Sequence, residues 1–213
     1  MMRLSVFGRS VKGEDHQENE DALLIDKRKN LFAVADGVTY PHGGKEAAVK
    51  SCKYLQKIFR GDLRDCFQKI NEHILKDKGK KFVGYTTFTA VHIDDGLLKV
   101  ANIGDSPVYM SNGEKIFRLT GSDRIFGTAS LSQAIGQETI FVHYSEEKLE
   151  IGSYIVIATD GVTDVMNKDE IFEIIKKQKI PHNIVSSILK KAVERPTVYN
   201  DDKTVIIVQV KEK

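Results

Sequence analysis

The spacing of hydrophobic residues changes along the chain, and each change marks an expected element. Short alternating or apolar stretches predict strands at 4–7, 22–26 and 31–35. From Gly44 onward the apolar residues recur every three or four positions, which is typical of an amphipathic helix. A second helix with the same spacing is expected after the break at Gly61-Asp62. The apolar positions of the two helices are Ala48, Cys52, Leu55, Phe59, Leu63, Phe67, Ile70 and Ile74.

After a charged segment from Lys76 to Lys81, predicted to be a solvated loop, the pattern returns to strands. The turn Asp94-Asp95-Gly96 lies between two apolar runs and predicts a β-hairpin. A second helical pair is expected near the end of the chain, followed by a last strand. The predicted strands are 85–93, 97–103, 108–110, 115–119, 139–144, 154–159 and 204–208, and the helices are 169–177 and 182–193.

This order of elements predicts the fold class. Strands joined by hairpins form antiparallel sheets, and two helical hairpins need two apolar sheet faces to cover. The expected fold is therefore α+β, a four-layer α-β-β-α sandwich of two antiparallel sheets flanked by helical hairpins. With 213 residues and no linker or internal repeat, the chain is interpreted as a single catalytic domain spanning 1–213.

Composition narrows the range of partners. A formal charge of +2 gives no reason to expect nucleic acid or an anionic membrane, and no apolar run approaches the length of a membrane span. The two cysteines, Cys52 and Cys66, are too few for a disulfide framework and fall in helical patterns. We therefore expect reduced core thiols and a cytoplasmic protein.

Aspartates at the ends of predicted strands carry the chemical signal. Asp36 and Asp160 directly follow apolar runs, and Asp201 precedes the last one. A carboxylate in such a place costs free energy to desolvate unless it is paired or binds a cation. Several of them without matching buried arginines indicate an oxygen-ligand site for hard divalent metals.

Five short motifs occur in an order that resembles the metal-dependent protein phosphatases of type 2C, the PPM family. They are NEDA (19–22), VADG (34–37), NIGDS (102–106), ATDGVTD (158–164) and DDKT (201–204). The resemblance implies an Mn²⁺- or Mg²⁺-dependent hydrolase of phosphoserine and phosphothreonine in proteins. It also implies direct attack on phosphorus by a hydroxide that bridges two divalent cations, since paired cations lower the pKa of a shared water. The partner would be a phosphorylated protein, with a Ser/Thr kinase acting in opposition in a signalling system.

The resemblance also implies roles for particular residues. Asp36 corresponds to the carboxylate that bridges two metals, and the Gly37 carbonyl joins the second metal. Asp160 and Asp201 correspond to ligands of the first metal, so Asp36 and Asp160 are the residues on which catalysis is expected to depend.

Three further acidic residues are implied to lie near the metals. Glu20 and Asp21 match the acidic pair beside the second metal, acting directly or through water. Asp105 matches a residue that helps Asp160 to hold a weaker third metal in bacterial members. A carboxylate after a strand is also a common turn or cap residue, and for Asp105 and Asp164 that alternative stays open.

The chain departs from the family pattern at several positions. His16 stands where a phosphate-binding arginine is usual, so it is the candidate for binding substrate phosphate, without the bidentate fork of arginine. Val38 stands where eukaryotic members have a histidine, and His42 is the nearby candidate for general acid. The alternative for His42 is a loop histidine with a structural hydrogen bond. Asp202 replaces the usual asparagine and is expected to add negative charge near the metals.

The segment 121–130 is short, so the flap of many bacterial members is mostly missing. In this the chain resembles the compact regulatory phosphatases of bacterial stress response and sporulation, and an open site suits a folded phosphoprotein. Two other functions remain open. One is a catalytically weak phosphatase-like module that binds a phosphoprotein partner in bacterial signalling. The other is a hydrolase of small phosphoesters, although no GxxxxGK[ST] phosphate loop is present.

Overall fold

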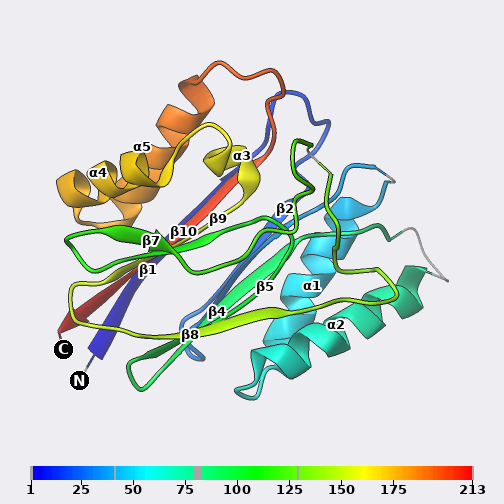
Figure 1. The fold of residues 1–213 in the computed structure, drawn as a ribbon, viewed down its shortest axis with the longest axis horizontal. Coiled ribbons are helices and arrows are strands. Elements are labelled where there is room, and N and C mark those ends of the chain that lie inside the picture. The colour runs from blue at the N-terminus through cyan, green and yellow to red at the C-terminus, as the bar shows by residue number, and fades with distance from the viewer. Residues whose placement is uncertain (1, 41, 79–82, 129, 213) are drawn as a thin grey trace.

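The computed structural model describes residues 2–40, 42–78, 83–128 and 130–212. Two antiparallel sheets lie against each other, and a pair of helices covers the outer face of each (Figure 1). The ends of the chain lie side by side, because the first and last strands pair along their full length, from Met2 opposite Glu212 to Val11 opposite Lys203.

One sheet, which we call sheet A, contains both ends of the chain. Its strand order is β1-β10-β9-β6-β7, and every neighbouring pair is antiparallel. The strands are β1 (Met2–Val11), β10 (Lys203–Glu212), β9 (Tyr154–Ala158), β6 (Val108–Ser111) and β7 (Ile116–Arg118).

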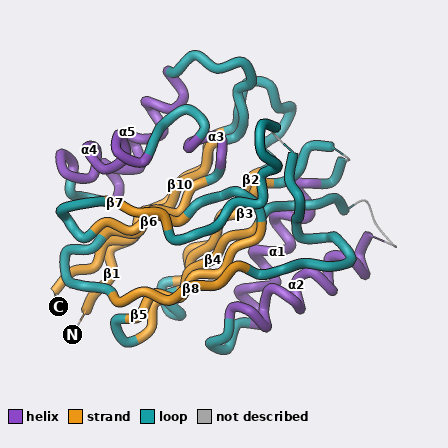
Figure 2. Tube along the Cα trace, in the orientation of Figure 1, coloured by secondary structure: helices purple, strands orange, loops and turns teal. Residues whose placement is uncertain are grey.

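The other sheet, sheet B, is a meander of four strands with one late strand added at its edge. Its order is β2-β3-β4-β5-β8, again antiparallel throughout. The strands of this sheet are labelled in Figure 2. The strands are β2 (Asp21–Asp26), β3 (Leu31–Asp36), β4 (Phe88–Asp94), β5 (Leu97–Ile103) and β8 (His143–Lys148).

Two helical pairs cover the outer faces of the sheets. The apolar sides of α1 (Gly44–Ile58) and α2 (Leu63–Lys78) share one core with sheet B. In the same way, α4 (Lys168–Gln178) and α5 (Pro181–Glu194) pack on sheet A. A single helical turn, α3 (Asp160–Thr163), follows β9. Among the described residues no helix combines the length and apolar character that crossing a membrane requires.

A third apolar core lies between the two sheets and holds them together. Phe32 and Val34 from sheet B meet Ile155, Ile206 and Val208 from sheet A, and all five side chains are fully buried. Successive side chains along a strand face opposite sides of the sheet. Each sheet therefore contributes side chains both to this core and to the core under its own helices. The predicted α-β-β-α sandwich is confirmed.

Most predicted elements are present, with a few differences at their ends. The helix α2 continues to Lys78, so the start of the predicted charged loop is helical, while 79–81 lie outside the described residues. The strand predicted at 139–144 is wrong, because β8 begins only at His143. This strand lies at the sheet edge and is partly exposed, so it is polar, and the more apolar stretch before it misled the prediction.

The hairpin expected at Asp94-Asp95-Gly96 is confirmed. Asp95 and Gly96 both have positive φ, at 45° and 77°, and Asp94 pairs with Leu97 across the turn. Two central residues with positive φ give a turn whose twist matches that of the flanking strands.

Both cysteines are buried in the core between sheet B and its helices, and neither forms a disulfide. Burial raises the pKa of the Cys52 thiol to about 12 and also raises the pKa of Cys66. The thiolate is the reactive form, so both thiols are expected to be inert in the folded protein.

Labelling with iodoacetamide at neutral pH tests this arrangement. In a Cys66→Ser variant, which leaves Cys52 alone, we expect the folded protein to react at least about 1000-fold more slowly than the urea-unfolded protein, from the lower thiolate fraction alone. Equal rates in the two states would contradict the burial of Cys52.

Candidate functional site

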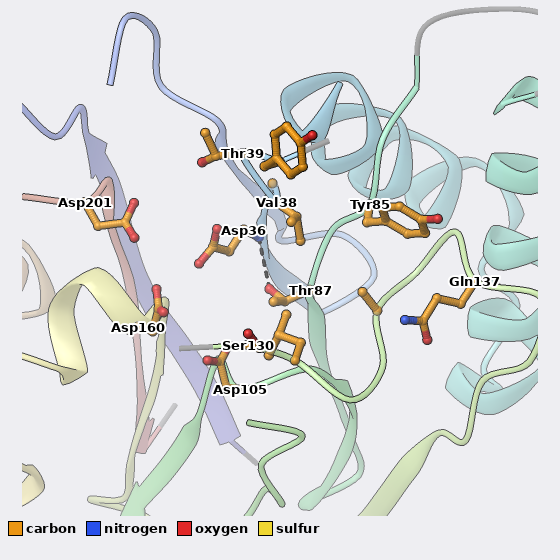
Figure 3. A pocket seen from close by; sticks show the side chains of 14 residues that line it. Asp36, Val38, Thr39, Tyr85, Thr87, Asp105, Ser130, Gln137, Asp160 and Asp201 are labelled. Carbon is orange, nitrogen blue, oxygen red and sulfur yellow. Dashed lines mark hydrogen bonds between the residues drawn. The ribbon is translucent and has the colours of Figure 1, made fainter. Parts of the chain in front are cut away.

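The predicted metal-binding aspartates meet at one end of the two sheets, around a cavity of 440 Å³ (Figure 3). Asp36 is the last residue of β3, Asp160 follows β9, and Asp201 precedes β10. Because β10 runs antiparallel to β9, its start lies beside the end of β9. The topology thus brings carboxylates that are far apart in sequence to a common edge, and the side chains of Asp36, Asp160 and Asp201 line the cavity.

The backbone of Asp36 is held by two neighbouring threonines. The amide of Asp36 donates to Thr87 Oγ1 over 3.1 Å, and the amide of Thr87 donates back to the Asp36 carbonyl over 2.8 Å. The hydroxyl of Thr86 donates to the same carbonyl, also over 2.8 Å. These three bonds fix the position from which the Asp36 carboxylate projects.

Two glycines at the site have no room for a side chain. A Cβ atom on Gly37 would overlap the backbone of Gly44, at the start of α1. A Cβ atom on Gly161 would overlap the carbonyl oxygen of Asp202. The close approach of the helix is thus a physical reason for glycine at position 37.

The cavity carboxylates are poorly compensated. Asp160 Oδ1 is buried and meets no hydrogen-bond donor within the described part of the chain. Burial, followed by the charge of Asp160, raises the pKa of Asp36 well above its usual value, and burial likewise raises the pKa of Asp160 and of Asp201. Clustered carboxylates of this kind are the donor set that Mn²⁺ and Mg²⁺ prefer, so the residues fit divalent cations.

One arginine that the sequence interpretation did not include lies among these carboxylates. Arg124 donates from Nε to Asp105 Oδ2 over 2.8 Å and from Nη2 to Asp160 Oδ2 over 2.6 Å. Its Nη1 donates to both oxygens of Asp164, at 3.0 and 2.8 Å. Burial and the charge of Asp160 raise the pKa of Asp105 to about 6, and Arg124 opposes that shift. The place expected for a third cation thus contains a guanidinium group.

Glu20 and Asp21 lie beside Asp36 but do not line the cavity. Asp21 is directly opposite Asp36 in the pairing of β2 with β3. Its Oδ2 accepts hydrogen bonds from the hydroxyls of Thr159 and Thr204, at 2.9 and 2.5 Å, and burial raises its pKa. Glu20 Oε2 accepts from the Thr39 hydroxyl over 2.7 Å. Their roles as metal ligands stay predictions.

His16 and Asp202 form a buried pair next to Asp201. His16 Nδ1 lies 2.7 Å from Asp202 Oδ2, while its Nε2 bonds the hydroxyl of Tyr199 and lies 3.4 Å from Asp201 Oδ1. The side chains of His16, Asp201 and Asp202 offer ligand atoms within 4.8 Å of one another. Since both ring nitrogens of His16 already have partners, its role in binding phosphate stays a prediction.

Asp202 also accepts two backbone N–H groups, those of Gly13 and Glu20, each over 2.7 Å. With His16 it therefore has three donors, and it ties the loop before β2 to the start of β10. Asp202 was expected to add negative charge near the metals, and this stays a prediction; in the structure the carboxylate holds the loop next to the cavity residue Asp201. His42 lies by a separate hollow that His16 and Glu20 also line, and its role as general acid stays a prediction.

Comparison with known proteins places this geometry in a family. The family model described as "Stage II sporulation protein E (SpoIIE)" matches residues 28–211. The chain therefore belongs to this family of PP2C-type, or PPM, serine/threonine phosphatase domains.

Individual relatives agree with this placement. "Probable protein phosphatase 2C 58" from Arabidopsis thaliana is 26% identical over 251 aligned positions, which cover 93% of this chain and 85% of the relative. Among solved structures, the catalytic domain of the serine threonine protein phosphatase PstP with two manganese ions has a TM-score of 0.86 at 20% identity, with all of both chains covered. The phosphatase MsPP from Mycobacterium smegmatis, in complex with cacodylate, has a TM-score of 0.82 at 24% identity, covering 96% of this chain and 97% of that one. At these identities the two structures establish the fold.

The tight contact at Gly161 gives a stability prediction. Gly161→Ala should lower the free energy of unfolding by about 3 kcal/mol, because the added methyl group overlaps backbone that cannot move without disturbing the start of β10. Chemical denaturation in urea measures the change.

Gly121→Ala is the matched control. Its added Cβ would lie 3.4 Å or more from the nearest atoms, on His143, so we expect a change of no more than about 0.5 kcal/mol. Similar stabilities for the two variants would contradict the packing of Gly161 against Asp202.

Proposed function

We propose that this protein is an Mn²⁺- or Mg²⁺-dependent phosphatase that removes phosphate from phosphoserine and phosphothreonine in other proteins. The observation that carries the proposal is the meeting of Asp36, Asp160 and Asp201 around one cavity, with a buried oxygen of Asp160 that has no donor among the described residues. Removing that many carboxylates from water is unfavourable unless cations bind them.

The residues that would hold the cations follow from these positions. Asp36 would bridge two cations, with Asp160 and Asp201 on one of them and the Gly37 carbonyl on the other. Glu20 and Asp21, behind Asp36, would support the second cation directly or through water. The bound pair would supply an activated water for in-line attack on phosphorus and would offset charge on the phosphoryl oxygens.

The protein's own contribution is positioning. Thr86 and Thr87 fix the backbone of Asp36, so its carboxylate does not have to be ordered when the cations and substrate bind. The neighbouring walls of the cavity are formed by Tyr85, Leu131 and Ala134. The charged side chains that line the cavity are all carboxylates. The affinity for a phosphate group would therefore depend on bound cations.

The class of substrate follows from what borders the cavity. Ile125 and Phe126, on the short segment beside it, are exposed, with Phe126 fully so. Exposed apolar side chains next to a catalytic cavity favour a protein surface over a small phosphoester as the substrate. A Ser/Thr kinase acting in opposition, in the cytoplasm, completes the proposal. His42 would be the general acid, and His16 would bind the substrate phosphate.

The first test measures phosphate release from phosphothreonine and phosphoserine peptides and from a folded phosphoprotein. With Mn²⁺ or Mg²⁺ we expect turnover, and with chelator none. Asp160→Asn should lower kcat at least about 100-fold, because it removes charge from the cation site.

Asp169→Asn is the matched control, since Asp169 is exposed at the start of α4 and does not line the cavity. It should keep the wild-type rate. If the wild-type protein binds cations but releases no phosphate from any of the substrates, the catalytically weak binding module is the better description. Equal rates in Asp160→Asn and wild type would overturn the assignment of Asp160.

A second test uses stability instead of activity. Bound cations relieve the repulsion among the buried carboxylates, and a ligand at one hundred times its Kd adds about 2.7 kcal/mol to the stability of the folded state. We therefore expect Mn²⁺ to raise the Tm by about 5–10 °C over the chelated protein.

The variant Asp36→Asn separates the effect of carboxylate repulsion on the Tm from the effect of cation binding. Without metal its Tm should be higher than that of the wild type, because one repelling charge has gone. The rise in Tm on adding Mn²⁺ should be smaller than in the wild type, because the variant lacks the proposed bridging ligand. A wild-type Tm that does not respond to Mn²⁺ or Mg²⁺ would contradict the proposed metal site.

A further inference from the structure

Arg124 belongs to the short segment that stands in place of the flap, and that segment is firmly anchored. Its neighbour Asp123 accepts the Gly104 amide on Oδ2 and lies 2.7 Å from His143 Nε2 through Oδ1. The amide of Asp123 donates to the Gly104 carbonyl, and its own carbonyl accepts the Ser132 amide over 2.7 Å. Four bonds of this kind fix the backbone from which the Arg124 side chain begins.

The segment turns back on itself directly after Arg124. Arg124 and Leu131 form an isolated antiparallel bridge, and the Ile125 amide donates to the Ser130 carbonyl over 2.8 Å. Leu131 lines the cavity, so the base of this small loop lies at the cavity wall. The guanidinium group is therefore placed by the fold, although its side chain is 27% exposed.

All three nitrogens of the Arg124 guanidinium group are used by carboxylates. Nε and Nη2 bind Asp105, Nη2 also binds Asp160, and Nη1 binds Asp164. The nitrogen–oxygen distances to Asp105 and Asp160 are 2.6–2.8 Å. Charge-assisted contacts of this length are the strong kind, and together they restrict the orientation of both acids.

This guanidinium group excludes a cation bound to the same oxygens. Mn²⁺ or Mg²⁺ lies roughly 2.0–2.2 Å from its oxygen ligands. A cation on Asp105 Oδ2 and Asp160 Oδ2 would have to occupy the space in which Arg124 Nη2 lies, 2.7 and 2.6 Å from those two atoms. The two positive groups cannot share that position, so one must be absent when the other is present.

We propose that Arg124 replaces a third divalent cation in this site, so that the protein binds two metal ions per chain and carries the third positive charge in its own sequence. Arg124 is then a positioning residue. It holds Asp160 by Oδ2 and leaves Oδ1, which is buried and has no donor in the described structure, available to a cation. The inference rests on the proposed function, because it concerns the number of cations at the same site.

The test counts bound Mn²⁺ by equilibrium dialysis or electron paramagnetic resonance, with free Mn²⁺ extended into the millimolar range. We expect two ions per chain in the wild type. Arg124→Met, which keeps an unbranched apolar stem without the charge, should bind three. Arg124→Lys keeps the charge and should bind two, and it serves as the matched control.

A double variant identifies where the additional ion binds. Arg124→Met combined with Asp105→Asn should return to two ions, because the new site has lost a ligand. If Arg124→Met does not fold, Arg124→Gln, which also lacks the charge, is counted in its place.

The number of Mn²⁺ ions bound per chain distinguishes the role of Arg124 from the proposed phosphatase function. Three ions in the wild type, or two in folded Arg124→Met, would overturn the role of Arg124 and leave the proposed function intact. No bound Mn²⁺ in the wild type would overturn the proposed function, and this inference with it.

Discussion

The repulsion among buried carboxylates at one end of the sandwich is the constraint on which the site depends. Asp36, Asp160 and Asp201 line one cavity, with Asp21 and Asp202 behind it. Each carboxylate behind the cavity has its own neutral or positive partners. Threonine hydroxyls hold Asp21, while backbone amides and His16 hold Asp202. The cavity acids have fewer partners. Asp160 binds Arg124 through Oδ2 and Asp201 accepts the amide of Asp202, but Asp160 Oδ1 has no donor in the described part of the chain. The uncompensated charge is therefore concentrated where cations can reach it.

Much of the fold could be predicted because the buried residues of a helix or strand recur at regular spacings in the sequence. Leu55 and Phe67 lie on helix faces that recur every three or four residues, and the Asp95-Gly96 turn has a strong local preference. The edge strand β8 could not be predicted, because half-exposed positions carry no strict alternation. The cavity aspartates were found because strand ends and motifs mark them.

The contacts of Arg124 and Asp202 could not be predicted from the sequence. Arg124 lies in a segment without periodicity, and nothing in the sequence near it indicates that it reaches Asp105 and Asp160, some 19 and 36 residues away. Asp201 and Asp202 are adjacent and chemically identical, yet one lines the cavity and the other binds a loop. Only the register of β10 decides which is which. The role of a residue that depends on how distant segments pack together therefore cannot be predicted from the sequence around it.

The pairing of β1 with β10 has a consequence for how the molecule forms. β1 lies at the edge of sheet A, and its neighbour in the sheet is β10, which follows about 200 residues later in the sequence. The loop after β1 is in turn held by Asp202, at the start of that last strand. Contacts between positions so distant in sequence are slow to form, because closing a long loop costs entropy before it gains any contact. During synthesis, β1 and the loop after it must therefore wait for these partners until β10 has been made.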